Sequence, residues 1–136
     1  MAIRLTSGTA LLQVYDMPRS LAFYRDLLGF ELVTSSPPGP VTHWAMLRNG
    51  AVYLMLNTKY EFDYERPLEP DRTSGRDDFA LYLMCEDADA AYRELQAKGW
   101  PDIDEPTTAA YGMRQLYIRD PDGFCVCLQH ETEHSS

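Results

Sequence analysis

The stretch DMPRSLAFYRDLLG, residues 16–29, has the apolar spacing of a helix, and the rest of the chain is organised around it. Its apolar side chains recur every three or four residues and form one stripe. The stripe consists of Met17, Leu21, Tyr24, Leu27 and Leu28. Asp16 is a suitable N-cap, Pro18 suits the first turn, and Gly29 can take the left-handed conformation that ends a helix. The sequence therefore predicts a helix over this stretch.

A second helix is predicted in DADAAYRELQAKG, residues 87–99, which also ends at a glycine. AFYRDL at 22–27 matches AAYREL at 90–95 at a constant offset of 68. Each helix follows a strand-like run, TALLQVYD at 9–16 and DFALYLMC at 78–85. These likenesses indicate an internal repeat of one module.

Each helix is also followed by a hairpin-like pair of strands. In the first module, HWAMLR and AVYLMLN flank Asn49-Gly50, a dipeptide that strongly signals a hairpin. In the second, MRQLYIR and FCVCLQH flank the turn residues DPDG at 120–123. A further strand, FELVTSS, fits between the first helix and its hairpin. The predicted fold class is therefore α+β, with the order strand, helix, three strands (βαβββ) occurring twice.

The two modules are expected to form one domain, with the first module at 1–57 and the second at 78–136. Residues 58–77, TKYEFDYERPLEPDRTSGRD, are polar, contain two prolines and a glycine, and are predicted to be a linker. The linker also carries three aromatic residues. Two readings of them stay open: they fold over a ligand, or they dock onto the body of the protein.

The composition excludes several classes of partner. Twenty-one acidic and twelve basic residues leave a formal net charge of −9, which repels nucleic acid and anionic membranes and attracts cations. No run of 18 apolar residues and no apolar leader is present, so neither a membrane span nor secretion is expected. Three cysteines, an odd number, suit reduced thiols. The expected location is the cytoplasm.

Two segments resemble a known superfamily. SLAFYRDLLGFEL at 20–32 and YIRDPDGFCVCLQ at 117–129 are similar to the signature stretches of the vicinal-oxygen-chelate superfamily, the glyoxalase and bleomycin-resistance group. The resemblance runs from about residue 9 to residue 130. It implies paired βαβββ modules whose strands curl into an open, barrel-like cup, with the helices outside.

The resemblance also implies four positions at which metal-dependent members hold a divalent ion. Carried over to this chain, these positions fall on Thr9, Leu54, Asp78 and Cys127. Leucine has no lone pair, threonine is a weak neutral ligand, and a carboxylate and a thiol prefer different metals. No metal and no other cofactor is therefore expected.

Strand alternation assigns further side chains to the interior of the cup, because residues two apart in a strand share a face. This assignment takes Arg48 to lie opposite Ala51 and Arg119 opposite Phe124. A one-residue bulge in the DPDG turn would reverse the second assignment. The ligand-binding residues expected on this basis are Thr9, Gln13, His43, Leu54, Asp78, Tyr82, Arg114, Leu116 and Cys127.

Several of these residues have a plainer structural interpretation. His43 suits a hydrogen bond to the backbone, Tyr82 suits packing, and Asp78 and Arg114 suit an ion pair between strands. Cys125 and Cys127 share a face, and with His130 they offer a soft-metal site or, more often in proteins, small buried side chains. The spacing reveals no catalytic triad or carboxylate pair, and no catalytic residue is assigned.

The resemblance and the predicted apolar cup favour a metal-free protein that binds a small organic ligand, as in drug sequestration. A cationic, aromatic compound is one candidate for this ligand. The C-terminal stretch from 111 to 131 is similar to the bleomycin-resistance branch, whose likeness also implies a homodimer. The alternative is a metal-dependent lyase, isomerase or dioxygenase with atypical ligands such as His43, Asp78 and Cys127. A third hypothesis is a dimerisation platform without a ligand.

Overall fold

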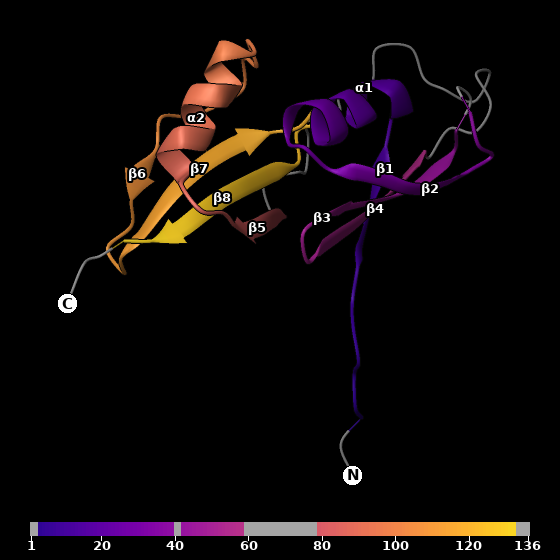
Figure 1. Cartoon of the computed structure of the whole chain (residues 1–136), viewed down its shortest axis with the longest axis horizontal. Helices are drawn as coiled ribbons and strands as arrows, with labels where there is room; N and C mark the ends of the chain where they lie inside the picture. Colours follow the sequence, from indigo (N-terminus) through magenta and orange to yellow (C-terminus); the bar gives the residue numbers. More distant parts are fainter. Residues whose placement is uncertain (1–2, 40–41, 59–78, 133–136) are drawn as a thin grey trace. The chain divides into compact units, whose positions relative to one another are not determined.

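The computed structural model describes residues 3–39, 42–58 and 79–132, and the chain divides into two compact units, 1–69 and 70–136 (Figure 1). Each unit contains a mixed four-stranded sheet and a helical segment. These units confirm the predicted α+β class and the two βαβββ modules. The predicted linker lies outside the described residues except for Thr58, as does Asp78.

The first module is built around a sheet of order β1-β4-β3-β2. Its elements are β1 (Ala10–Val14), α1 (Met17–Leu21), the π-helical turn η1 (Ala22–Leu27), β2 (Glu31–Ser36), β3 (Trp44–Asn49) and β4 (Val52–Thr58). The second sheet has the matching order β5-β8-β7-β6. Its elements are β5 (Ala80–Met84), α2 (Ala88–Ala97), β6 (Thr107–Thr108), β7 (Met113–Arg119) and β8 (Cys125–Glu131). Among the described residues, no helix combines the length and apolarity needed to cross a membrane.

The helices begin with equivalent caps and differ by one residue in length. Asp16 accepts a hydrogen bond from the backbone N–H of Arg19, and Asp87 accepts one from Ala90, so the caps align the modules at an offset of 71. The glycines that end the helices, Gly29 and Gly99, have an offset of 70 and positive φ. The turn η1 takes up the extra residue. The sequence match at an offset of 68 is therefore not the structural alignment, which pairs the buried Tyr24 with the buried Leu95.

In the first sheet, one face is buried and the other is open. Leu12 lies opposite Leu56 and Leu47 opposite Leu54, and all four are at most 2% exposed on the face that carries α1. On the other face, Leu11 is 42% exposed. Because β1 pairs with β4 through Ala10–Leu54, Leu54 faces away from Thr9 and Gln13.

The predicted orientation of Leu54 toward the cup was therefore wrong. Every strand position in this hairpin except its ends is apolar, so the alternation carries no signal for which face meets the helix. The turn was also wrong: Asn49 lies opposite Val52, so Gly50 and Ala51 form the loop. His43 was expected opposite Leu56, whereas its carbonyl accepts a hydrogen bond from the backbone N–H of Thr58. His43 thus continues the register of the helix-covered face.

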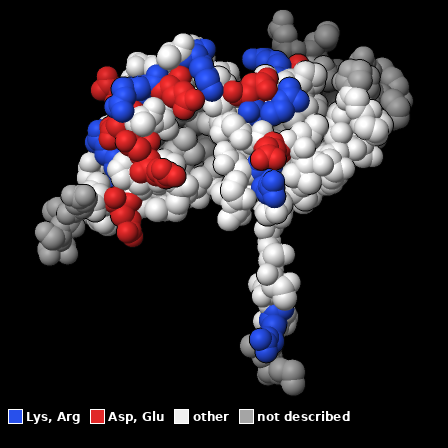
Figure 2. Space-filling view, viewed as in Figure 1, with Lys and Arg blue, Asp and Glu red and all other residues white. Residues whose placement is uncertain are grey.

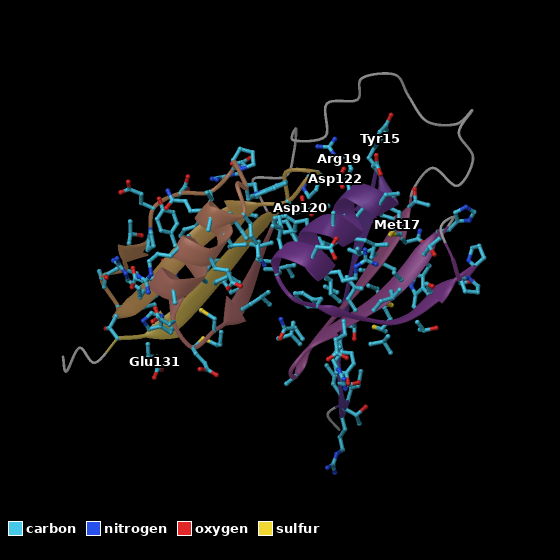
Figure 3. All side chains as sticks on the ribbon, turned by 45° about the horizontal axis from the view of Figure 1, so that its top comes forward. Tyr15, Met17, Arg19, Asp120, Asp122 and Glu131 are labelled. Carbon is cyan, nitrogen blue, oxygen red and sulfur yellow. The ribbon has the colours of Figure 1, made fainter. Side chains whose placement is uncertain are left out.

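In the second sheet, the register of β7 against β8 is set by a three-residue loop. Asp120 and Phe124 are joined by a backbone hydrogen bond, and Arg119 lies opposite Cys125. One Asp120 carboxylate oxygen accepts from the backbone N–H groups of Asp122 and Phe124, at 2.9 and 2.8 Å. Gly123 has a φ of +85°, typical of a three-residue hairpin loop. Figure 3 shows Asp120 and Asp122 at this end of the hairpin and Glu131 at the other end of β8.

This loop reverses the predicted orientation of β7. Arg114 and Leu116 were expected in the cup, but both share a face with Val126, which lies beneath α2. Leu116 is fully buried there, and the Arg114 guanidinium bonds to the Asp89 carboxylate of α2 at 2.8 Å. The observed ion-pair partner of Arg114 is therefore Asp89; the partner considered from the sequence, Asp78, lies outside the described residues.

The two faces of the first sheet are expected to respond differently to truncation. Leu56→Ala should lower the free energy of unfolding by about 2–5 kcal/mol, because it leaves a cavity under the helix. Leu11 lies on the open face, and its strand partner Met55 is next to Leu56 in β4. Leu11→Ala should therefore lower the free energy of unfolding by less than about 1 kcal/mol. Urea denaturation of both variants measures the difference. Equal losses would contradict the assignment of the faces.

The Asp89–Arg114 pair is expected to make stability depend on acid pH. The hydrogen bond from Arg114, opposed by desolvation, lowers the pKa of Asp89 below its ordinary value of 3.8. A lowered folded-state pKa stabilises the protein above the unfolded pKa, and this stabilisation is lost as the pH falls through the folded pKa.

Asp89→Asn should therefore reduce the melting temperature at pH 7 and flatten its decline below about pH 5. The matched control is Glu94→Gln on the same helix, whose exposed pair with Lys98 spans 3.7 Å and should contribute less. Thermal unfolding followed from pH 7 to pH 2 tests both variants. An unchanged acid limb in Asp89→Asn would refute the role of the pair.

Candidate ligand-binding face

The open face of the second sheet brings together aromatic, amide and sulfur-containing side chains. Cross-strand partners share a face of a sheet, so the register identifies its members. They are Ala80, Tyr82 and Met84 of β5, Cys125, Cys127, Gln129 and Glu131 of β8, and Met113, Gln115, Tyr117 and Arg119 of β7. Tyr82 and Met84 are 51% and 60% exposed. Within the described part of the second unit, α2 covers the opposite face and no helix covers this one.

Five polar side chains form a continuous hydrogen-bonded set on or beside this face, which we call the tyrosine–glutamine chain. The hydroxyls of Tyr82 and Tyr117 are 3.1 Å apart, and the Tyr117 hydroxyl donates to Gln115 Oε1 at 3.2 Å. Gln115 Nε2 donates to the Tyr111 hydroxyl and to Gln129 Oε1, both at 2.9 Å. These bonds fix the orientation of both amides.

The two tyrosine rings at the centre of the face meet edge to face. The centroids of Tyr82 and Tyr117 lie 6.2 Å apart at 89°. The hydrogen bond with Tyr82, followed by burial, raises the pKa of Tyr117 well above the usual phenol range. Tyr117 therefore keeps its proton at neutral pH and acts as a hydrogen-bond donor rather than as a base.

The cysteines offer little nucleophilic or metal-binding capacity. Burial raises the pKa of Cys85, Cys125 and Cys127, so the thiolate form that attacks or ligates is disfavoured. His130 lies on the other face of β8, where its Nδ1 accepts from the backbone N–H of Ala88 at 2.9 Å. The soft-metal arrangement considered from the sequence is therefore not assembled.

The first sheet has a smaller polar element on its own open face. Asn57 Nδ2 donates to Gln13 Oε1 at 3.2 Å, across the register of β1 and β4. Leu11 and Tyr53, both more than two-fifths exposed, share this face. In the aligned modules, the Gln13–Asn57 pair corresponds to Met84–Gln129 of the second sheet.

The structure places the expected ligand-binding residues on different faces. Thr9 and Gln13 lie on the open side of β1, and Tyr82 and Cys127 are register neighbours on the open face of the second sheet. The helix-covered faces hold Leu54, Arg114 and Leu116, with His43 continuing that register in the first module. Asp78 lies outside the described residues.

The register changes two of the four positions that the resemblance assigns to a metal. With the N-caps aligned, Leu11–Met55 corresponds to Tyr82–Cys127, so Met55, not Leu54, is the counterpart of Cys127. The same alignment makes Ala80, rather than Asp78, the counterpart of Thr9. A hydroxyl, a thioether, a methyl and a thiol of raised pKa give no set of hard donors. Within 3–39, 42–58 and 79–132, no group of three or more His, Cys, Asp or Glu is arranged to hold a metal.

Sequence reasoning missed Gln115, Tyr117 and Tyr111. The first two were assigned to the wrong side because a four-residue turn was assumed at DPDG. The turn itself carries the signal that identifies them. Proline in the second position and glycine in the left-handed position favour a three-residue loop, and a loop of three residues instead of four moves the side chains of β7 to the opposite face. Tyr111 precedes β7 and gave no periodic signal.

Comparisons with known proteins agree with this fold. A crystal structure of a glyoxalase/bleomycin resistance protein/dioxygenase from Nocardioides matches with a TM-score of 0.74 and 22% identity, over 100% of this chain and 89% of that one. TnmS3, an antibiotic binding protein from Streptomyces sp. CB03234, matches with a TM-score of 0.68 and 26% identity, over 97% and 99%. A glyoxalase/bleomycin resistance protein from the same strain matches at 25% identity and a TM-score of 0.64, over 92% and 100%. None of the curated proteins matches the chain significantly.

The sequence itself carries the family signal over most of its length. The family model of the Glyoxalase/Bleomycin resistance protein/Dioxygenase superfamily matches residues 6–128, which include both helices and both hairpins. The modular fold and the solved structures agree with this match. The chain therefore belongs to the glyoxalase/bleomycin resistance protein/dioxygenase superfamily.

Proposed function

We propose that this protein binds a small organic ligand without a metal, on the open face of its second sheet, as in the sequestration of a drug. The observation that carries this proposal is the tyrosine–glutamine chain beside the exposed side chains of Tyr82 and Met84. Small-molecule sites combine aromatic and apolar side chains with a few oriented polar groups, and this face holds both kinds. Stacking on one tyrosine ring contributes about 1 kcal/mol beyond its buried area.

The chemistry of the face favours binding over catalysis. Tyr117 and the thiols keep their protons at neutral pH, because the pKa values of Tyr117 and all three cysteines are raised. A lyase, isomerase or dioxygenase of this superfamily would need a divalent ion, and the side chains at the four metal positions are poor ligands for one. No specific observation favours the enzymatic alternative.

A relative and the charge of the chain support a drug-like ligand. TnmS3, which is 26% identical over nearly the whole of both chains, is described as an antibiotic binding protein. The net charge of −9 favours the approach of cationic compounds. Figure 2 shows acidic side chains gathered over the second module, around α2. The proposed ligands are therefore aromatic compounds, cationic ones among them.

Titration with bleomycin and with the planar cation proflavine tests the proposal by calorimetry. Tyr82→Ala should weaken binding of a responding probe about tenfold, because it removes the exposed ring from the face. Tyr92→Ala on α2 is the matched control and should leave the affinity unchanged. A chelator should also have no effect. Absence of binding at high micromolar concentrations of both probes, or loss of binding with the chelator, would contradict the proposal.

We also propose that the protein is a homodimer. Residues 3–9 are exposed throughout, and Ile3 and Leu5 are 87% and 88% exposed. In Figure 1 this segment runs away from the first sheet, and it leads into β1, an edge strand of that sheet. Exposed apolar side chains on an extended segment that leads into an edge strand are typical of pairing between chains.

Light scattering is expected to find a dimer for the wild-type protein at about 10 µM, in the range where specific interfaces of standard size are occupied. The double variant Ile3→Asp, Leu5→Asp should be monomeric, because charges would be buried without partners. Thr6→Asp adds a charge to the same segment without removing an apolar side chain and should remain dimeric. A monomeric wild type, or a dimeric double variant, would argue against the segment as the contact.

A cytoplasmic location is part of the same proposal. Cys85, Cys125 and Cys127 are all free thiols. Unpaired cysteines of this kind are usual in the reducing cytoplasm and uncommon in secreted proteins of this size.

A further inference from the structure

Two amides anchor the tyrosine–glutamine chain. Gln115 Oε1 is a carbonyl oxygen and can only accept, and the Tyr117 hydroxyl lies 3.2 Å from it. In the 3.1 Å contact between Tyr82 and Tyr117, either hydroxyl can be the donor. The glutamine amides therefore determine where the chain has a donor to spare.

The donors and acceptors of the two amides, Gln115 and Gln129, are fixed by their hydrogen bonds. Both protons of Gln115 Nε2 are used, one on Tyr111 and one on Gln129 Oε1. Since Oε1 of Gln129 faces Gln115, its Nε2 must point the other way. The acceptor there is the sulfur of Met84 at 3.8 Å, and a thioether accepts weakly. Among the described residues, Gln129 Nε2 donates to no oxygen or nitrogen atom.

The chain therefore has a spare donor at Gln129 Nε2, which is turned toward β5 and the exposed side chain of Met84. The Tyr111 hydroxyl accepts from Gln115 and also keeps its own proton, and Tyr111 is 71% exposed. Because Gln129 Nε2 points away from Gln115, it does not share an acceptor with Tyr111. A carbonyl oxygen that replaces the sulfur of Met84 can accept from Gln129 Nε2. Glu131 lies beyond Gln129 on the same face.

We infer that this face prefers a flat ligand that presents a carbonyl oxygen to Gln129 Nε2, with its ring system against Tyr82 and Met84. The inference rests on the proposed function and narrows it: acidic charge attracts cations to the protein, whereas the amide donor at the site selects for a hydrogen-bond acceptor. Met84 yields its weak contact to the ligand, so binding replaces a poor acceptor by a good one.

Two probes with the same three fused rings test the inference. N-methylacridone carries a carbonyl oxygen, and N-methylacridinium carries a positive charge and no acceptor. Fluorescence titration of the whole protein should give an affinity about tenfold higher for N-methylacridone, as expected for one hydrogen bond gained. Equal affinities, or a preference for the cation, would overturn the inference and leave the proposed binding function standing.

Gln129→Glu is the decisive variant. A glutamate at this position still accepts from Gln115 but cannot donate, so the preference for N-methylacridone should be lost and N-methylacridinium should bind more tightly. Gln96→Glu on α2 adds the same charge away from the face and should keep the preference. A Gln129→Glu variant that retains the wild-type preference refutes the inference. Failure of both probes to bind the wild type refutes it too, whereas bleomycin and proflavine test the binding function separately.

Discussion

The carboxylate of Asp120 determines which side chains of β7 lie on the open face of the second sheet. It accepts two backbone N–H groups within the turn, and Asp120 is only 3% exposed, so the loop between β7 and β8 closes with an odd number of residues. A register shift of one residue would exchange every side chain between the two faces. Gln115 and Tyr117 would then lie beneath the helix, and Arg114 would lie on the open side. The tyrosine–glutamine chain depends on this single hydrogen-bonded turn.

Much of the fold could be predicted from local sequence patterns. The N-caps Asp16 and Asp87, the closing glycines and the order of the elements follow from residue types whose conformational preferences are strong. The faces of the strands were harder to predict. In the first hairpin the residues on both faces are apolar, so only the pairing of β1 with β4 reveals that Leu54 faces the helix. In the second hairpin, the number of residues in one turn determined the face on which Arg114 and Leu116 lie. The hydrogen-bonded chain on the open face depends on contacts between strands that no local pattern records.

The two modules keep one framework and use it differently. Arg114 connects β7 to Asp89 of α2, whereas the equivalent position of the first module holds His43, whose carbonyl accepts from the backbone N–H of Thr58. At equivalent places on the open faces, the first module holds a Gln13–Asn57 amide pair and the second holds Met84–Gln129. The replacement of an amide by a thioether leaves the donor of Gln129 with a weak partner. At this place the second module therefore has the amide donor that is more available to another hydrogen-bond acceptor.

The π-helical turn in the first helix bears on how the two halves diverged. Between cap and glycine the first helix has one residue more than the second, and η1 absorbs it without moving either end. Such a turn accommodates one additional residue between helix ends that keep their positions. If both halves descend from one duplicated segment, this length difference arose after the duplication. An alignment of the two halves then needs a one-residue gap opposite residues 22–27.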